Sequence, residues 1–243
     1  MKNTLYITAS CLSALLTLAP LSTLADDAKS SPSAAPLPAA GSAAGSAASS
    51  ATSSPEAILQ QLLAGNQRFV ANALTHTNQT ASRRDEVAKG QHPVAMVLTC
   101  SDSRVPPEVV FDQGLGDLFV IRNAGNILDD HGLGSMEYAV EHLHVTLLVV
   151  LGHEKCGAVS AAAAGGEVPG HIRSIVEAIE PAVETAKTQS GDLVDNAVRA
   201  NVTRVVGQLK HIGPILSEAI SAGKLKVVGA RYDLDSGRVE ILP

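Results

Sequence analysis

Short runs of apolar residues, separated by segments of helical periodicity, set the fold class of this chain. Four of them are predicted strands: Val94–Thr99, Leu118–Arg122, Val145–Leu151 and Leu225–Tyr232. Runs without polar alternation are typical of strands that are buried on both faces, as in parallel sheets covered by helices. We therefore predict an α/β protein with a four-stranded parallel sheet flanked by helices. After a turn at residues 233–237, Arg238–Leu242 is predicted to return as one antiparallel edge strand.

Apolar residues at helical spacing predict the segments that flank this sheet. The first helix begins at Pro55, with Ser54 as a candidate cap, and forms an N-terminal helical arm. Further helices are predicted at residues 83–89, 134–142, 156–164, 171–188, 193–209 and 214–222. The sequence has no Trp and little aromatic content, so the core must be mainly aliphatic.

The N-terminal residues predict export. Lys2 precedes an apolar run from Leu5 to Leu18, and small residues follow at 22–25, which is the layout of a signal peptide. The run falls short of the ~20 residues that a membrane-spanning helix needs, which disfavours an anchor. Residues 1–25 are predicted to be a signal peptide, 26–54 a flexible linker rich in Ala, Ser, Pro and Gly, and 55–243 one folded domain. The expected location is the bacterial periplasm or the medium, without membrane attachment after cleavage.

The charge of the chain disfavours nucleic acid as a partner. The formal net charge is −6, and the loss of Lys2 with the signal peptide makes the mature chain one unit more negative. Proteins that bind nucleic acid usually present a basic surface to the phosphates.

Polar side chains that can bind a metal follow two of the predicted strands. Cys100 and Asp102 follow the first strand, and His153 and Cys156 follow the third. Ligands of parallel α/β sheets bind beyond the carboxyl ends of the strands, so these side chains converge if the two strands are neighbours. Two cysteines and a histidine suit zinc, and three ligands with one exchangeable position are the catalytic pattern. A Cys100–Cys156 disulfide is the alternative, but it leaves His153 and Asp102 without a role.

Arg104 gives Asp102 a second possible partner besides the metal. A bidentate pair with Arg104 would keep the Asp102 carboxylate off the zinc and leave the fourth position open to water. With Asp102 on the zinc, the site would be closed. Asp102 could also accept a hydrogen bond from zinc-bound hydroxide and orient it for attack. The alternative is an exposed ion pair of small energetic value.

At these residues the chain resembles the β-class carbonic anhydrases over most of residues 55–243. The motif C-x-D-x-R is present at 100–104, H-x-x-C at 153–156, and "FVIRNAGN" at 119–126 is similar to the segment between them. The resemblance implies that Cys100, His153 and Cys156 bind one zinc ion per chain and that Asp102 and Arg104 form the gating pair. It also implies a substrate pocket with contributions from Gln91, Phe119 and Tyr138.

The resemblance further implies the reaction and the assembly. The expected reaction is the reversible hydration of carbon dioxide to bicarbonate and a proton by zinc-bound hydroxide. A homodimer or a dimer of dimers is expected, with Tyr138 contributed across the dimer interface and the N-terminal arm packed on the partner. Val97 and Thr99 replace the Trp and Gly of family members that have an inhibitory bicarbonate site, which favours an open zinc site near neutral pH. His92 is a candidate proton shuttle.

Three alternative functions match parts of the sequence. Family relatives hydrolyse carbon disulfide or carbonyl sulfide, so the substrate stays open between these and carbon dioxide. A zinc dehydrogenase would need a phosphate-binding glycine loop, and "HGLGSME" at 131–137 lacks the third glycine. A structural zinc or disulfide domain that binds a partner would show no carbon dioxide hydration.

Overall fold

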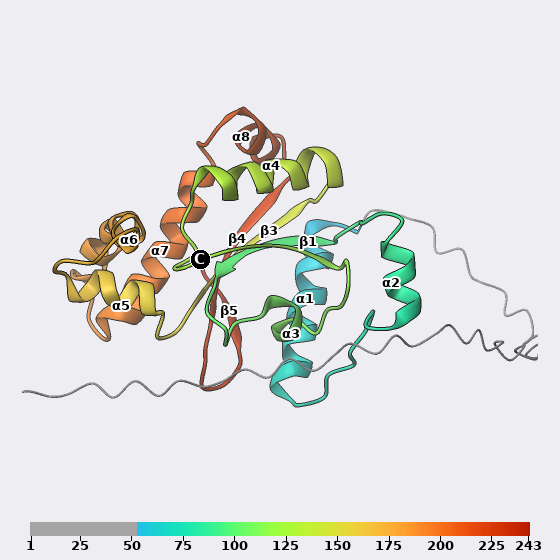
Figure 1. Ribbon diagram of the computed structural model, residues 1–243, viewed down its shortest axis with the longest axis horizontal. Coiled ribbons are helices and arrows are strands. Elements are labelled where there is room, and N and C mark those ends of the chain that lie inside the picture. The colour runs from blue at the N-terminus through green and yellow to red at the C-terminus, as the bar shows by residue number, and fades with distance from the viewer. Residues whose placement is uncertain (1–52) are drawn as a thin grey trace, which may run out of the picture. The chain divides into compact units, whose positions relative to one another are not determined.

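The computed structural model describes residues 53–243, and Figure 1 shows how they are arranged. The predicted signal peptide and almost all of the predicted linker lie outside the described residues. No helix in the part of the chain from residue 53 onward combines the length and the hydrophobicity needed to cross a membrane.

The described residues contain one five-stranded sheet in the order β2-β1-β3-β4-β5. Its strands are β1 (Ala95–Cys100), β2 (Leu118–Asn123), β3 (Leu147–His153), β4 (Lys226–Tyr232) and β5 (Val239–Ile241). The first four are parallel and β5 pairs antiparallel with β4, which confirms the predicted fold class. Every residue of β1 and β3 is buried, whereas β2 at the sheet edge is partly exposed.

Helices cover both faces of this sheet. They are α1 (Pro55–Val70), α2 (Ala81–Val87), α3 (Pro107–Val110), α4 (Asp130–Leu143), α5 (Gly157–Ala164), α6 (Ile172–Ala186), α7 (Leu193–Leu209) and α8 (Pro214–Ser221). In Figure 1, α1 and α3 lie on one side of the sheet, and α4 and α8 lie on the other. The side chains packed between these layers are almost all aliphatic, as the composition predicts.

The helix boundaries agree with the sequence prediction within a few residues, with two exceptions. Helix α4 begins at Asp130, four residues before the predicted start, because Asp129 caps it by accepting a hydrogen bond from the Gly132 backbone N–H. Two glycines in its first turns lower the helix propensity there, so propensity does not indicate this start. The short helix α3 was not predicted, and Pro107 at its first turn suits its start.

The N-terminal arm packs on its own chain. The Ser54 hydroxyl accepts from the Ala57 N–H at 3.2 Å, as expected of the cap. Ile58, Leu59 and Leu62 on α1 are buried in the cluster that includes Phe111 and one face of β1 and β3. Packing of this helix on a partner subunit stays a prediction.

Helix α7 packs closely against the carboxyl-terminal half of β3. A Cβ atom at Gly152 would lie 2.6 Å from Cγ2 of Val202 on this helix, so that position needs a glycine. Helices α5, α6 and α7 share a third apolar cluster that includes Cys100 and Cys156. The end of the sheet that bears the predicted site is therefore enclosed by three helices.

Candidate metal centre

Three side chains that can bind a metal meet at the carboxyl edge of the sheet. Cys100 is the last residue of β1, His153 is the last residue of the neighbouring β3, and Cys156 caps the N-terminus of α5. One ligand atom from each lies within 4.8 Å of the others, and all three residues are buried. Both cysteines are free thiols with their sulfurs 3.9 Å apart, which contradicts the disulfide alternative. The predicted neighbourhood of the two strands is confirmed.

His153 has one ring nitrogen available for a metal. Its Nδ1 lies 2.8 Å from the Glu154 carbonyl oxygen, which can only accept, so Nδ1 must donate a proton. In the neutral ring, Nε2 then has a free lone pair. Nε2 is fully buried and has no hydrogen-bond partner among residues 53–243. A backbone carbonyl on one nitrogen and an unpaired second nitrogen are typical of a metal-binding histidine.

The two sulfurs form a coupled pair. A hydrogen bond from the Cys156 thiol lowers the pKa of Cys100 to about 4, and the interaction with His153 and the Gly125 backbone N–H act in the same direction. The same contact with Cys100 raises the pKa of Cys156, because one proton stays between the two sulfurs. A dication would replace that proton and hold both groups as thiolates. Two sulfurs and one imidazole nitrogen are a donor set that fits zinc.

Asp102 and Arg104 form the predicted pair next to these donors. Arg104 Nε donates to Asp102 Oδ1 at 2.9 Å, Nη2 donates to Oδ2 at 2.8 Å, and the Arg104 backbone N–H adds a bond of 2.9 Å. These hydrogen bonds hold the pKa of Asp102 well below its usual range, so the carboxylate is ionised. Its Oδ2 is 3.8 Å from His153 Nε2. The carboxylate thus lies beside the metal donors while Arg104 holds it.

Two other residues hold the loop after β1, and sequence reasoning missed both. Arg122 donates from Nε to the Cys100 carbonyl at 3.0 Å and from Nη2 to the Asp102 carbonyl at 2.7 Å. The Gly125 backbone N–H donates to Cys100 Sγ at 3.3 Å. Both belong to the segment "FVIRNAGN", which the family resemblance covers without giving either position a role.

The predicted pocket residues do not meet the metal donors within one chain. Gln91 is exposed and precedes β1, whereas Cys100 ends that strand. Phe119 pairs with Met96, four residues before Cys100, which corresponds to roughly 13 Å along the strand at 3.3 Å per residue. Phe119 and Tyr138 contact each other, with ring centroids 6.3 Å apart, and Tyr138 is 48% exposed.

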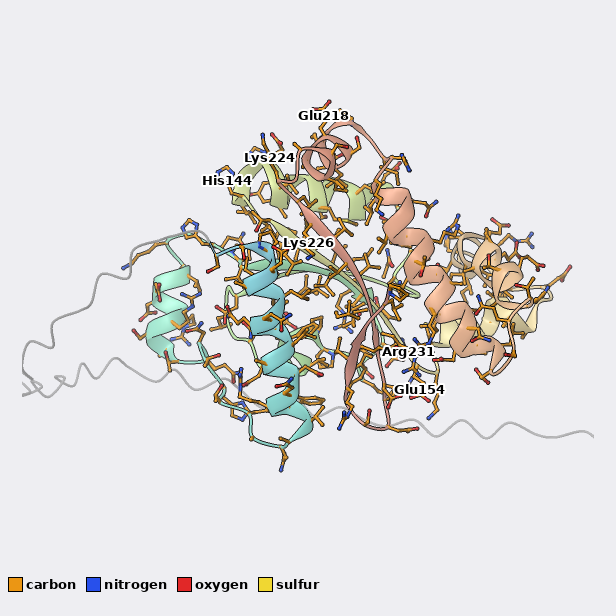
Figure 2. The ribbon with its side chains drawn as sticks, turned by 180° about the vertical axis from the view of Figure 1, so that it is seen from behind. His144, Glu154, Glu218, Lys224, Lys226 and Arg231 are labelled. Carbon is orange, nitrogen blue, oxygen red and sulfur yellow. The ribbon has the colours of Figure 1, made fainter. Side chains whose placement is uncertain are left out.

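A cavity of about 900 Å³ lies at the opposite end of the sheet. Val145 and Thr146 before β3 and Lys224 before β4 line it, together with residues of α4 and α8. Figure 2 shows this separation: His144, Glu218 and Lys224 lie at one end, and Glu154, next to His153, lies at the other. The site at the carboxyl edge is therefore distinct from this cavity. The remaining histidines are all exposed: His76, His92, His131, His142, His144, His171 and His211.

The fold and the donor set first define a class of protein. This is an α/β protein whose sheet presents, at the carboxyl edge of its parallel strands, a buried Cys-His-Cys cluster that can hold a metal ion. A family model described as carbonic anhydrase matches residues 95–239. Carbonic anhydrase 2 of Mycobacterium tuberculosis is 44% identical over 188 residues, which cover 76% of this chain and 91% of that protein. A carbonic anhydrase of Pseudomonas aeruginosa is 34% identical over 76% of this chain and 87% of its own length.

Solved structures agree with this class. A tetrameric β-carbonic anhydrase of Sordaria macrospora superposes with a TM-score of 0.62 at 27% identity, covering 76% of this chain and 96% of that one. A Coccomyxa β-carbonic anhydrase bound to acetazolamide gives 0.60 at 28% identity, covering 76% and 86%. The chain belongs to the β-class carbonic anhydrase family, and it is an enzyme of that family.

Proposed function

We propose that this enzyme catalyses the reversible hydration of carbon dioxide to bicarbonate and a proton, with Cys100, His153 and Cys156 holding one zinc ion. The observation that supports this most strongly is the buried, unpartnered Nε2 of His153 beside two free thiols. All three ligand atoms lie within 4.8 Å of one another, so one ion can contact them together. A bound zinc ion with three protein ligands activates a water molecule as a nucleophile at neutral pH.

Asp102 and Arg104 control access to that site. Two thiolates already neutralise a zinc dication, so the Asp102 carboxylate is not needed as a ligand. Arg104 holds it by two side-chain hydrogen bonds and so keeps it from closing the site. From this position the ionised carboxylate can accept a hydrogen bond from the attacking water and orient its lone pair toward the carbon of the substrate.

The substrate pocket is proposed to be completed by a partner subunit. Gln91 precedes β1 and Cys100 is the last residue of that strand, and the five steps from Ala95 to Cys100 alone span roughly 17 Å, so Gln91 can reach a zinc site only in another chain. The half-exposed Tyr138 beside Phe119 gives an aromatic surface that a partner can cover. The unit is a homodimer or a dimer of dimers.

Complementation tests this arrangement. Gln91→Ala and Arg104→Ala chains are each expected to have little activity. When they are mixed under conditions that exchange subunits, a hybrid dimer contains one zinc site with an intact Arg104 and a partner that supplies Gln91. Activity should therefore return. Failure of the mixed sample to gain activity, with exchange verified by mass spectrometry, would show that Gln91 does not act across the interface.

Export to the periplasm is also proposed, on the basis of Lys2, the apolar run at 5–18 and the small residues at 22–25. N-terminal sequencing of the protein recovered from the periplasmic fraction should show a start near Asp26. An intact Met1 in the cytoplasmic fraction would contradict this.

Stopped-flow measurement of carbon dioxide hydration tests the proposed reaction. The rate should fall with zinc content during chelation and return when zinc is added. Hydration that survives complete zinc removal would refute the mechanism. A protein with one zinc per chain and no hydration should be assayed with carbon disulfide and carbonyl sulfide, and turnover of either would replace carbon dioxide as the substrate.

A further inference from the structure

We infer that Asn201 on α7 is a positioning residue for the metal ligand Cys100 and that it acts through the turn at Gly125. This inference rests on the proposed function, since it requires that Cys100 bind the metal. Asn201 is far from the metal ligands in sequence, and its hydrogen bond goes to the Gly125 backbone rather than to Cys100. Its role is to fix the backbone group that donates a hydrogen bond to the ligand sulfur.

The first step is the contact between Gly125 and Cys100. The Gly125 N–H donates to Cys100 Sγ at 3.3 Å, and Gly125 has φ of +77°, a conformation that favours glycine. A Cβ atom at this position would lie 2.6 Å from Ile179 Cδ1 and 3.2 Å from Ala158 Cβ. Helices α5 and α6 therefore press on this residue from two sides, and its N–H has little freedom to move away from the sulfur.

The second step is the anchor on the other side of Gly125. Asn201 Nδ2 donates to the Gly125 carbonyl at 2.9 Å, across 76 residues of sequence. Asn201 is completely buried, and its Oδ1 has no hydrogen-bond partner in the described part of the chain. A buried amide with one unpaired oxygen is costly for folding. Asn201 therefore adds little net stability. What its amide does provide is the hydrogen bond from Nδ2 that fixes the orientation of Gly125.

The consequence concerns the electron density on the ligand sulfur. Hydrogen bonds to a thiolate reduce the charge that it donates to a metal, and such outer contacts tune metal sites. Two thiolates make zinc a weaker Lewis acid than a set of neutral imidazoles would. The Gly125 N–H reduces the electron donation from the Cys100 sulfur, and Asn201 keeps this N–H directed at the sulfur.

The test compares Asn201→Leu with a matched control on the same helix. The substitution removes one buried unpaired acceptor, Oδ1, and creates another, the Gly125 carbonyl oxygen. Because these two effects oppose each other, the free energy of unfolding should change little. Asn196→Leu is the control, because Asn196 also lies on α7 and donates its amide to a backbone carbonyl, that of Ser190, at 3.1 Å. The readouts are the cadmium NMR chemical shift of cadmium-substituted protein, the rate of zinc transfer to a chromogenic chelator, and the urea midpoint.

Asn201→Leu should shift the cadmium resonance, because the hydrogen bond to the Cys100 sulfur changes. It should also accelerate zinc loss by about tenfold, the lower end of the usual effect of such outer contacts, because the Gly125 turn no longer holds the sulfur in its place. Asn196→Leu should change neither quantity. A second variant, Asn201→Ser, retains a hydroxyl donor and should restore part of the wild-type shift. An Asn201→Leu protein with the wild-type cadmium shift and zinc transfer rate would overturn the inference. If Asn201→Leu does not fold, an Asn201→Ser protein that folds and keeps the wild-type cadmium shift unchanged would overturn it as well. If wild-type protein binds no metal at Cys100, the proposed function itself fails, which the wild-type sample reveals separately.

Discussion

Gly125→Ala tests how tightly the turn that contacts Cys100 is packed. The new methyl group enters a left-handed backbone conformation, which costs about 1–2 kcal/mol for a residue with a Cβ. It also lies 2.6 Å from Ile179 Cδ1, and overpacking of this kind costs about 1–3 kcal/mol. The two costs together predict that the free energy of unfolding falls by about 2–5 kcal/mol.

A second substitution separates these two costs. Ile179→Val removes Cδ1, the atom closest to the new methyl group, and alone should cost about 0.5–1.5 kcal/mol. In the Gly125→Ala/Ile179→Val double variant the overlap with Ile179 Cδ1 is removed, while the backbone cost and the 3.2 Å approach to Ala158 Cβ remain. The double variant should therefore be more stable than the sum of the single effects predicts, by about 1–3 kcal/mol.

The assay is urea unfolding of the zinc-loaded protein at one fixed protein concentration, because metal binding and oligomerisation both shift apparent stability. Gly134→Ala is the matched control. Gly134 lies in α4, and no atom packs within 4 Å of the position that an added methyl group would take, so alanine there should stabilise the protein by about 0.5–1 kcal/mol. Additive single effects at Gly125 and Ile179, within about 0.5 kcal/mol, would refute the reasoning.

Three further predictions concern the gate and the turn after β4. Arg104→Ala should retain one zinc per chain and lose hydration activity, since Asp102 is then free to close the site; a fully active variant would exclude the gating role. Asp102→Ala should retain zinc and slow hydration at least about tenfold, and loss of zinc instead would make Asp102 an obligatory ligand. Hydrogen bonds from Ser236, and then Arg231, lower the pKa of Asp233 to about 2. Because the unfolded carboxyl has a pKa of about 3.9, the unfolded state binds more protons between these values, and the free energy of unfolding should rise with pH from about 2 to about 4. Asp233→Asn should reduce that rise, and an unchanged slope in urea unfolding would contradict it.

The three candidate metal donors could be predicted from sequence because all of them lie at or just after the ends of two strands. Val94–Thr99 and Val145–Leu151 are apolar enough to identify two buried strands, and parallel strands bring their carboxyl ends to one edge of the sheet. The actual strands extend through Cys100 and His153, so these two candidate ligands are the last residues of their strands, while Cys156 lies at the start of α5. This shift does not change the site.

Other parts of the site depend on contacts that no local pattern reveals. In the sequence, Asn201 is indistinguishable from an ordinary polar residue on a helix. Only the packing of α7 over the turn at Gly125 shows its hydrogen bond to that turn. Gln91 and Tyr138 matched pocket positions by resemblance, yet one chain leaves them away from Cys100. Their proposed contribution needs a second subunit, and no local sequence pattern shows where a second subunit lies.

The candidate metal donors are buried, whereas the Asp102–Arg104 pair reaches the surface, and this difference matters for the proposed gate. Cys100, His153 and Cys156 are all buried at the ends of packed elements, so their donor atoms are held by the sheet and by α5. The Arg104 side chain is 52% exposed and the Asp102 side chain 17%. The proposed exchange of the carboxylate between Arg104 and a bound zinc would therefore need only side-chain rotation at the surface and no movement of the strands. Such a gate could open and close while the three donors keep the metal bound. Loss of Arg104 should therefore reduce turnover and leave the zinc content unchanged.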